Sequence, residues 1–281
     1  MALISCSDIE WKLLSDLIER EFGLLFDGVR QGILISRLAT RLISLHLHSY
    51  GDYYRYVNSH PQRLEELHLV ACTITNNESY FFREAHQFEI LTKHVIPSIL
   101  PRLHGDPIRI LSAGCSSGEE PYSISILLQN AGFELRGYRW EIDACDINRT
   151  RLATAEVGIY DPYSLRTCDE EAKTRYFDLN EKTKKFALRE PHKKWVRFTE
   201  RNLAVENPDW PQGLYHAIFC RNVLIYFSER AFHNAISLFA KGIVPNGYLF
   251  LGHSESLIRR RSDFEPVTLD GSVIYQKTTD I

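Results

Sequence analysis

The stretch P-I-R-I-L-S-A-G-C-S-S-G-E-E-P-Y-S-I-S-I-L-L-Q at positions 107–129 decides the fold. Its apolar residues 108–111 have the character of a short buried strand, and small residues make up the loop 112–118. Glu119 and Glu120 then begin a helix whose apolar side chains recur at helical spacing. A strand, a glycine turn and a helix in this order predict an open α/β sheet that binds its ligand at the carboxyl end of a parallel strand.

The composition of this turn limits the ligand. A dinucleotide site usually has Gly-x-Gly-x-x-Gly, whereas this loop has only Gly114 and Gly118, and the two glutamates that follow would repel a pyrophosphate. No Gly-Lys-Ser/Thr follows, which excludes a Walker loop. S-adenosylmethionine (SAM) carries a sulfonium, an ammonium group and a ribose, and it fits such a turn. The alternative is a plain turn in which the glutamates complement the helix dipole.

Length and composition are typical of an ordinary globular protein with two domains. The chain has 281 residues, 44% of them hydrophobic, and a net charge of −3, which does not favour a nucleic-acid partner. Its 6 cysteines contain no C-x-x-C pair, so we expect reduced thiols and no metal site. There is no leader-like start and no apolar run long enough to cross a membrane, which predicts a cytoplasmic protein without membrane insertion.

Residues 1–74 predict a helical domain, because apolar side chains recur at helical spacing in several segments. An amphipathic helix is expected within residues 1 to about 22, with Asp8 as a candidate cap. The other expected helices span residues 30–48, 52–56 and 62–73.

Three arginines of the second helix, Arg30, Arg37 and Arg41, are seven and four residues apart, which places them along one helix face. Two interpretations are open. The arginines form either a solvated basic face or a docking strip for an acidic helical partner.

Residues 75–100 predict a linker and a hinge helix, the helix covering 88–100. The segment 74–84 mixes polar residues with three consecutive aromatics. Because three adjacent aromatic side chains cannot all enter one helix's core face, we expect part of this cluster to line a pocket or a seam between domains. The plainer alternative is a hinge helix packed on the catalytic domain, and the two interpretations are compatible.

The strand predicted at 140–145 ends at Asp146, whose carboxylate can accept hydrogen bonds from both ribose hydroxyls. This favours a nucleoside-bearing cofactor without separating SAM from NAD. A strand at 217–220 places Arg221 and Asn222 at the same cleft. A helix is expected at 232–243, with strands at 248–252 and 273–276.

Between residues 158 and 200 the pattern becomes irregular. Segments 186–188 and 196–198 are predicted to pair as a small antiparallel insert with 190–194 as its tip. Such an insert often serves a partner, the alternative being a surface excursion without a role.

Six blocks of the sequence resemble the chemotaxis receptor glutamate methyltransferases, the CheR family, in the family's order and over nearly the whole chain. The resemblance implies a class I SAM-dependent methyltransferase: a Rossmann-like α/β fold with a seven-strand sheet. It also implies an N-terminal helical domain (1–74), a linker (75–100), and a catalytic domain (101–281) with an antiparallel β-subdomain inserted at about 160–198. The blocks are T-N-N-E-S-Y-F-F-R-E (75–84), G-C-S-S-G-E-E-P-Y-S (114–123), C-D-I-N (145–148), R-N-L (201–203), F-C-R-N-V-L-I-Y-F (219–227) and P-N-G-Y-L-F-L-G-H-S-E-S-L (245–257).

The resemblance also implies site roles. Arg83 and Tyr226 would stand nearest the transferring methyl, and Asp146 would bind ribose. Ser79 stands where many relatives have threonine, and it keeps the hydroxyl. The residues expected to contact the cofactor are Asn77, Ser79 and Arg83 from the linker, Ala113 and Glu119 along the methionine part, Asn202 and Leu203 beside adenine, and Asn222 and Val223 in the cleft.

The implied reaction forms γ-methyl esters on glutamates of methyl-accepting chemotaxis receptors and converts SAM to S-adenosylhomocysteine (SAH). Receptor helices would dock on Arg30, Arg37 and Arg41, and in some members the insert grips a C-terminal receptor tether peptide. A monomer is expected.

Three alternatives are weaker. An amino-group methyltransferase would carry an Asn-Pro-Pro-Tyr-like motif where this chain has R-N-V-L at 221–224, and a non-catalytic SAM-binding module could lack Arg83 and Tyr226. Oxidation could block the cleft if the thiols predicted near its rim were reactive, although buried inert thiols are the plainer expectation. These thiols belong to Cys115, Cys145 and Cys220.

Overall fold

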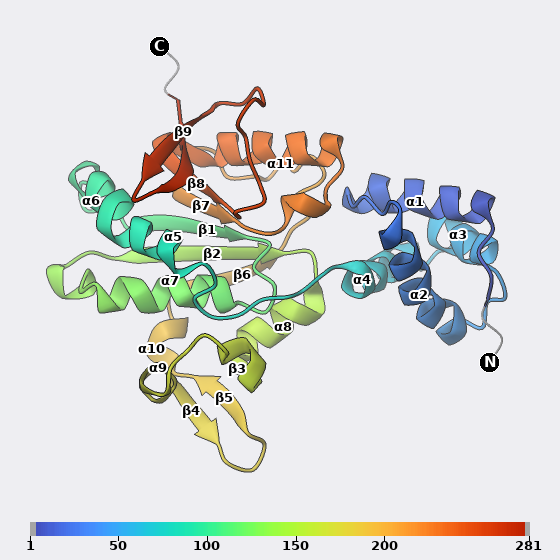
Figure 1. The fold of residues 1–281 in the computed structure, drawn as a ribbon, viewed down its shortest axis with the longest axis horizontal. Coiled ribbons are helices and arrows are strands. Elements are labelled where there is room, and N and C mark those ends of the chain that lie inside the picture. The colour runs from blue at the N-terminus through green and yellow to red at the C-terminus, as the bar shows by residue number, and fades with distance from the viewer. Residues whose placement is uncertain (1–3, 279–281) are drawn as a thin grey trace.

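The computed structural model describes residues 4–278 and shows a helical domain beside an α/β domain (Figure 1). The first three residues of the expected helical domain and the last three of the chain lie outside the described part. The helical domain packs its helices around one apolar core that includes Leu17, Leu38 and Val70. Its helices are α1 (Asp8–Phe22), α2 (Val29–Ser44), α3 (Tyr50–Ser59) and α4 (Arg63–Ile74).

Helix ends differ from the sequence prediction in α1, α2 and α3, and α3 extends beyond the predicted 52–56 at both ends. The N-cap of α1 is Ser7 rather than Asp8, because Ser7 and Glu10 form a capping box in which each side chain accepts the other residue's backbone N–H. Helix α2 ends four residues before the predicted position at 48, and the backbone turns at His46, where φ is +54°.

The α/β domain is built on a seven-stranded sheet with the strand order β6-β2-β1-β7-β8-β10-β9. Strands β6, β2, β1, β7 and β8 run parallel, and β10 runs antiparallel to both of its neighbours, β8 and β9. This confirms the expected class I methyltransferase fold. The strands are β1 (Ile108–Ala113), β2 (Trp140–Asp146), β6 (Val196–Glu200), β7 (Tyr215–Cys220), β8 (Ile243–Leu251), β9 (Phe264–Leu269) and β10 (Ser272–Lys277).

Helices cover both faces of this sheet, as Figure 1 shows. On one face α11 (Glu229–Gly242) packs on side chains such as Leu111 and Ile218. On the other, α7 (Glu119–Asn130) and the helical linker pack on Ile110 and Phe219. The predicted helix at 88–100 is present as a run of short helical pieces: α5 (Ala85–Ile90), the π-helical turn η1 (Leu91–Val95), α6 (Ile96–Ile99) and the turn η2 (Leu100–Arg102). None of the helices in the described range is long and apolar enough to cross a membrane.

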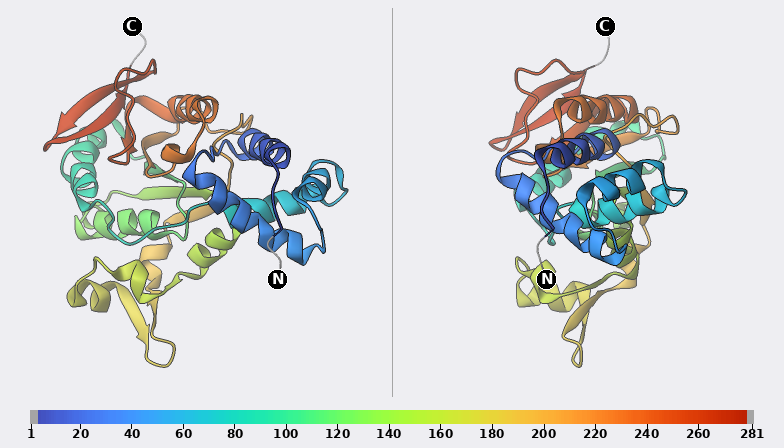
Figure 2. Two further views of the ribbon diagram at one scale, coloured as in Figure 1. Left: turned by 45° about the vertical axis from the view of Figure 1, so that its right-hand side comes forward. Right: turned by 90° about the vertical axis from the view of Figure 1, so that its right-hand side faces the viewer.

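The insert follows α8 (Arg149–Val157) and differs from the prediction. It is a three-stranded antiparallel sheet, β3-β5-β4, that projects from the side of the large sheet (Figure 2). The predicted pairing of 186–188 with 196–198 is wrong, because β6 instead pairs in parallel with β2. The elements of this region are β3 (Ile159–Tyr160), the turn η4 (Pro162–Leu165), α9 (Glu170–Tyr176), β4 (Phe177–Asn180), β5 (Lys185–Leu188) and α10 (Glu190–Lys193).

Burial explains this difference. Val196 and Phe198 pack against Ala144 and Leu152 beside the large sheet and also against the insert's buried cluster, which includes Leu188, so their apolar side chains join the insert to the large sheet. The segment predicted as the hairpin tip forms α10 instead, and residues 181–184 connect β4 to β5.

The two domains meet through a short backbone pairing. The N–H of Leu25 donates to the carbonyl of Tyr226 (2.8 Å), and the N–H of Ser228 donates to the carbonyl of Gly23 (2.8 Å). Gly23 has φ +67°, and a Cβ there would lie 2.4 Å from Cβ of Ala231 and 2.5 Å from Cβ of Ala204. Only glycine fits this junction.

Gly23→Ala is therefore expected to lower the free energy of unfolding by about 3 kcal/mol, from left-handed backbone strain and overpacking. Gly32→Ala is the control, because Gly32 lies in α2 with nothing within 4 Å of an added Cβ. That change should stabilise by about 0.5–1 kcal/mol. Urea unfolding measures both. Equal midpoints for the two variants would contradict the close approach at the junction.

Candidate functional site

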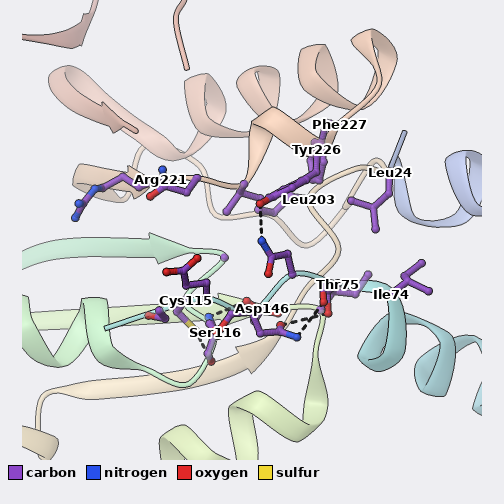
Figure 3. Close-up of a pocket in the computed structure, with 18 of the residues that line it drawn as sticks. Leu24, Ile74, Thr75, Cys115, Ser116, Asp146, Leu203, Arg221, Tyr226 and Phe227 are labelled. Atoms are coloured by element: carbon purple, nitrogen blue, oxygen red, sulfur yellow. Dashed lines mark hydrogen bonds between the residues drawn. The ribbon is translucent and has the colours of Figure 1, made fainter. Parts of the chain in front are cut away.

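A cleft of about 300 Å³ lies where the helical domain and the linker meet the carboxyl ends of β1, β2 and β7 (Figure 3). Most of the predicted site residues line it, although they come from distant parts of the chain. Those that do are Asn77, Ser79, Arg83, Asp146, Asn202, Leu203, Asn222, Val223 and Tyr226; Ala113 and Glu119 do not.

The glycine loop forms one wall of the cleft and needs its glycines. Gly114 has φ +80°, and a Cβ there would lie 2.3 Å from Cγ2 of Val223. Gly118 has φ +88° and closely approaches Ala155. The loop therefore presents backbone to the cleft, as the sequence predicted.

Asp146 lies at the end of β2 and fixes this loop. Its Oδ2 accepts the N–H of Ser116 and its Oδ1 accepts the N–H of Asn148, both at 2.8 Å. Each carboxylate oxygen keeps a second lone pair, so both can still accept a ribose hydroxyl. Burial raises the pKa of Asp146 above its usual range, and the backbone N–H groups oppose that shift.

The two glutamates at the start of α7 point in different directions. Glu119 is 1% exposed, and its Oε1 accepts the hydroxyls of Ser117 and Ser164 at 3.0 Å each. Glu120 lines the cleft instead, where it accepts the hydroxyl of Ser112 at 2.6 Å. Burial raises the pKa of the Glu120 carboxyl. Of the two adjacent glutamates, Glu120 lines the cleft and the predicted cofactor contact Glu119 does not.

Arg221 ties the linker to the sheet. Its guanidinium lies 3.3 Å from Oε2 of Glu120 and 3.4 Å from Oε2 of Glu84, and it donates to the carbonyl of Arg83. The Arg83 side chain points elsewhere: it donates to the carbonyl of Glu78 (3.1 Å) and makes no ion pair with a carboxylate in the range 4–278. Arg83 can therefore meet an incoming anion.

Asn148, the N-cap of α8, bonds to two linker residues that line the cleft. Its Nδ2 lies 3.0 Å from Oγ1 of Thr75 and 3.2 Å from Oδ1 of Asn77. On the opposite wall Asn202 donates from Nδ2 to the carbonyl of Glu21 (2.7 Å) in α1. Both asparagines hold the walls of the cleft together.

Glu255, whose role no local sequence pattern indicates, organises the loop after β7. Its carboxylate accepts backbone N–H groups from the loop and one from the end of β8. The donors and distances are Asn222 (2.9 Å), Val223 (2.8 Å), Leu224 (2.7 Å), Ile225 (3.3 Å) and Gly252 (2.7 Å).

This anchoring holds Asn222 at φ +60° in the wall of the cleft. The Oδ1 of Asn222 is buried without a hydrogen-bond partner among the residues described. A buried acceptor without a partner is costly, so it fits a ligand that brings an N–H group. SAM has such groups in its ammonium and its adenine amine, and the cleft residues therefore fit this cofactor.

The three arginines predicted to dock a partner have different surroundings. Arg30 lies over the ring of Tyr226, 5.3 Å from its centroid. Arg37 donates to the carbonyl of Ile74 at 2.6 Å, and Arg41 makes two hydrogen bonds to Glu66 at 2.9 and 2.6 Å. Arg37 and Arg41 thus fasten α2 to α4. Arg30 and Arg37 both line the cleft, and of these two only Arg37 is held by a backbone carbonyl of the described residues.

The cysteines near the cleft are unreactive in character. Only Cys115 lines the cleft. Burial raises the pKa of the thiols of Cys115 and Cys220, and that of Cys145 to about 12. Because the thiolate is the reactive form, these surroundings do not support oxidative control. No group of His, Cys, Asp and Glu side chains suited to a metal ion occurs within residues 4–278.

Comparison with known proteins gives the family. Residues 77–273 match the profile "CheR methyltransferase, SAM binding domain", and residues 9–68 match "CheR methyltransferase, all-alpha domain". The chain is 34% identical to chemotaxis protein methyltransferase 2 of Vibrio cholerae, over 98% of this chain and 94% of that protein. It is 33% identical to the chemotaxis protein methyltransferase of Salmonella typhimurium, over 99% and 93% of the two chains, and 32% identical, with the same coverage, to that of Escherichia coli.

Proposed function

This chain belongs to the CheR methyltransferase family, and on that premise we propose that it forms γ-methyl esters on glutamate side chains in the cytoplasmic helices of chemotaxis receptors. Its cofactor is SAM, which supplies a methyl group activated by a sulfonium. The protein would act in the cytoplasm as a monomer, and its products would be the ester and SAH.

The distribution of charge around the cleft carries this proposal. The carboxylates of Asp146 and Glu120 line the inner wall, the latter paired with Arg221, and both suit a cationic methyl donor. The arginines Arg30, Arg37 and Arg83 line the other side, towards the helical domain and the linker. This polarity suits a reaction between a cation bound inside and a carboxylate arriving from outside.

The chemistry requires little from the protein beyond alignment. A glutamate with a pKa of about 4.3 is already ionised near neutral pH, so no general base is needed. The charges of donor and acceptor disappear as they react, so water opposes the reaction. Alignment of two reactants can lower a barrier by about 7–11 kcal/mol. We assign Arg83 to orienting the incoming carboxylate, since tight pairing would lower its reactivity.

The surroundings of the arginines narrow the docking surface to Arg30. Leu25 and Ile33, which are 42% and 46% exposed, line the cleft beside it. A cation flanked by exposed apolar side chains suits an amphipathic acidic helix. The insert would hold a receptor tether peptide, because in the order β3-β5-β4 each outer strand has one edge without a partner strand among the residues described.

Arg30→Glu is expected to raise the KM for receptor about tenfold, equivalent to about 1.4 kcal/mol, because it opposes an acidic helix. The Kd for SAH measured by calorimetry should stay within about twofold, since Arg30 contacts Tyr226 rather than the glycine loop. Arg41→Glu is the contrasting variant: it faces the buried Glu66 and should lower thermal stability instead. An unchanged KM for Arg30→Glu would refute this docking surface.

The reaction itself is tested with methyl-labelled SAM and membranes that contain candidate receptors. Label on the receptor that mild base releases as methanol supports a glutamate ester. Base-stable label would indicate an amino-group methyltransferase. Failure to bind SAM or SAH by calorimetry would overturn the proposed function altogether.

A further inference from the structure

A hydrogen bond joins the linker to the loop after β7 across the cleft. Nδ2 of Asn76 donates to Oη of Tyr226 at 2.6 Å, although the two residues are 150 positions apart. Both side chains line the cleft, where Figure 3 shows Tyr226 above Asp146 and Thr75. Asn76 was not among the residues that the sequence singled out.

Tyr226 is held at several points besides its hydroxyl. Arg30 covers its ring, its carbonyl accepts the N–H of Leu25 at 2.8 Å, and its own N–H donates to the carbonyl of Val223 at 3.2 Å. The ring therefore has little freedom to swing away. Within this frame the contact from Asn76 decides how the hydroxyl is oriented.

The hydrogen-bonding capacity of the phenol is only partly used. A tyrosine hydroxyl has one proton to donate and lone pairs to accept with. Asn76 occupies a lone pair, and no acceptor in residues 4–278 lies within hydrogen-bond distance of the proton. With the oxygen held by the amide, the proton is available to a group that enters the cleft. A donor bonded to the oxygen also strengthens the phenol as a donor, because linked hydrogen bonds polarise one another.

We propose that Asn76 is a positioning residue, whose amide holds Oη of Tyr226 so that the phenol proton meets the non-reacting oxygen of the substrate carboxylate. The role rests on the proposed function. Tyr226 donates a hydrogen bond and transfers no proton. One carboxylate oxygen forms the bond to the methyl carbon as the carbon–sulfur bond breaks, while the other is held in place. A neutral donor orients the carboxylate with less loss of reactivity than a cation would cause.

A double-mutant cycle tests this coupling. Asn76→Ala is expected to lower kcat about 5- to 10-fold with little change in the KM for receptor, and Tyr226→Phe should lower it at least as much. In the Tyr226→Phe background, Asn76→Ala should have no further effect, because the hydroxyl that it orients is absent. Asn76→Asp should lower kcat more than Asn76→Ala does, since a carboxylate would take the phenol proton for itself.

The controls separate positioning from structure and from the cofactor. Asn58 is exposed and makes no side-chain hydrogen bond among the described residues, so Asn58→Ala should leave kcat unchanged. Calorimetry with SAH should give the same Kd, within about twofold, for the unaltered protein and Asn76→Ala.

Three results would overturn the role of Asn76: an unchanged kcat, an equal loss in both backgrounds, or a rise in the Kd for SAH that matches the loss of kcat. If the unaltered protein forms no base-labile ester, the proposed function fails first and this role falls with it.

Discussion

Replacing Glu255 with glutamine is expected to weaken SAH binding roughly 100-fold and to lower kcat at least as much. The carboxylate of Glu255 accepts five backbone N–H groups, four of them from the loop that carries Asn222, Val223 and Tyr226. Glutamine turns one oxygen into a donor that faces N–H groups. Losing two hydrogen bonds to a charged group costs about 3 kcal/mol or more, which is roughly 100-fold in an equilibrium constant.

Calorimetry with SAH and thermal unfolding check this expectation together. Glu66→Gln is the matched control, because Glu66 is also buried, at 3% exposure, and its oxygens accept from Arg41 and Tyr53 in the helical domain. Both variants should lose thermal stability, and only Glu255→Gln should lose SAH affinity when assayed well below its Tm. If both variants bind SAH alike, Glu255 supports the fold and does not organise the cleft.

The parts of the site that the sequence revealed are those encoded locally. Gly114 and Gly118 stand in a turn between a strand and a helix, and Asp146 ends the next strand. In a parallel sheet such ends meet at one edge, so a short pattern places them together. The structure agrees, since Asp146 bonds directly to the glycine loop.

The sequence-based predictions of strands were wrong or incomplete where the position of a strand depends on partners that are distant in the sequence. The strand at 196–200 has the apolar pattern of a hairpin arm, yet it pairs with β2 and packs Val196 and Phe198, partly buried, against Ala144 and Leu152. The sequence pattern does not indicate strand β9, because it is an edge strand in which one residue of six is buried, and such a strand gives a weak hydrophobic signal. Neither a register nor an edge can be deduced from a local pattern alone.

A local pattern also gives no indication of the role of Glu255, and it does not show which of Glu119 and Glu120 faces the cleft. The N–H donors of Glu255 in the loop lie about thirty positions away, so nothing near it in the sequence indicates its role. Glu119 and Glu120 are adjacent at a helix start, where about 100° of helix rotation separates their side chains. Only packing decided which of the two faces the cleft.

Replacing Asp146 with asparagine is expected to weaken SAM and SAH binding by about 10²- to 10³-fold and to flatten the pH dependence of binding. Both oxygens of Asp146 accept backbone N–H groups, so an amide NH₂ would oppose either Ser116 or Asn148 and displace the loop. It would also lose one of the two acceptors proposed for ribose. Each hydrogen bond to a charged group contributes about 1.5–3 kcal/mol, and a loss of about 3–4 kcal/mol from more than one such bond corresponds to the expected range.

The pH dependence has a definite sign. Burial raises the pKa of Asp146, so as pH falls this carboxyl takes up its proton earlier than an exposed aspartate does, and SAH affinity should fall with it. Burial also raises the pKa of Glu120. In Asp146→Asn the titration of Glu120 should therefore leave a smaller dependence of SAH affinity on pH.

Asp143→Asn is the control on the same strand, because Asp143 accepts the hydroxyl of Tyr215 outside the cleft and should leave both affinity and slope unchanged. Calorimetry between pH 5 and 8 measures all three proteins. An unaltered protein whose SAH affinity rises as pH falls would contradict the assignment, because a carboxylate that accepts ribose hydroxyls must bind best when ionised.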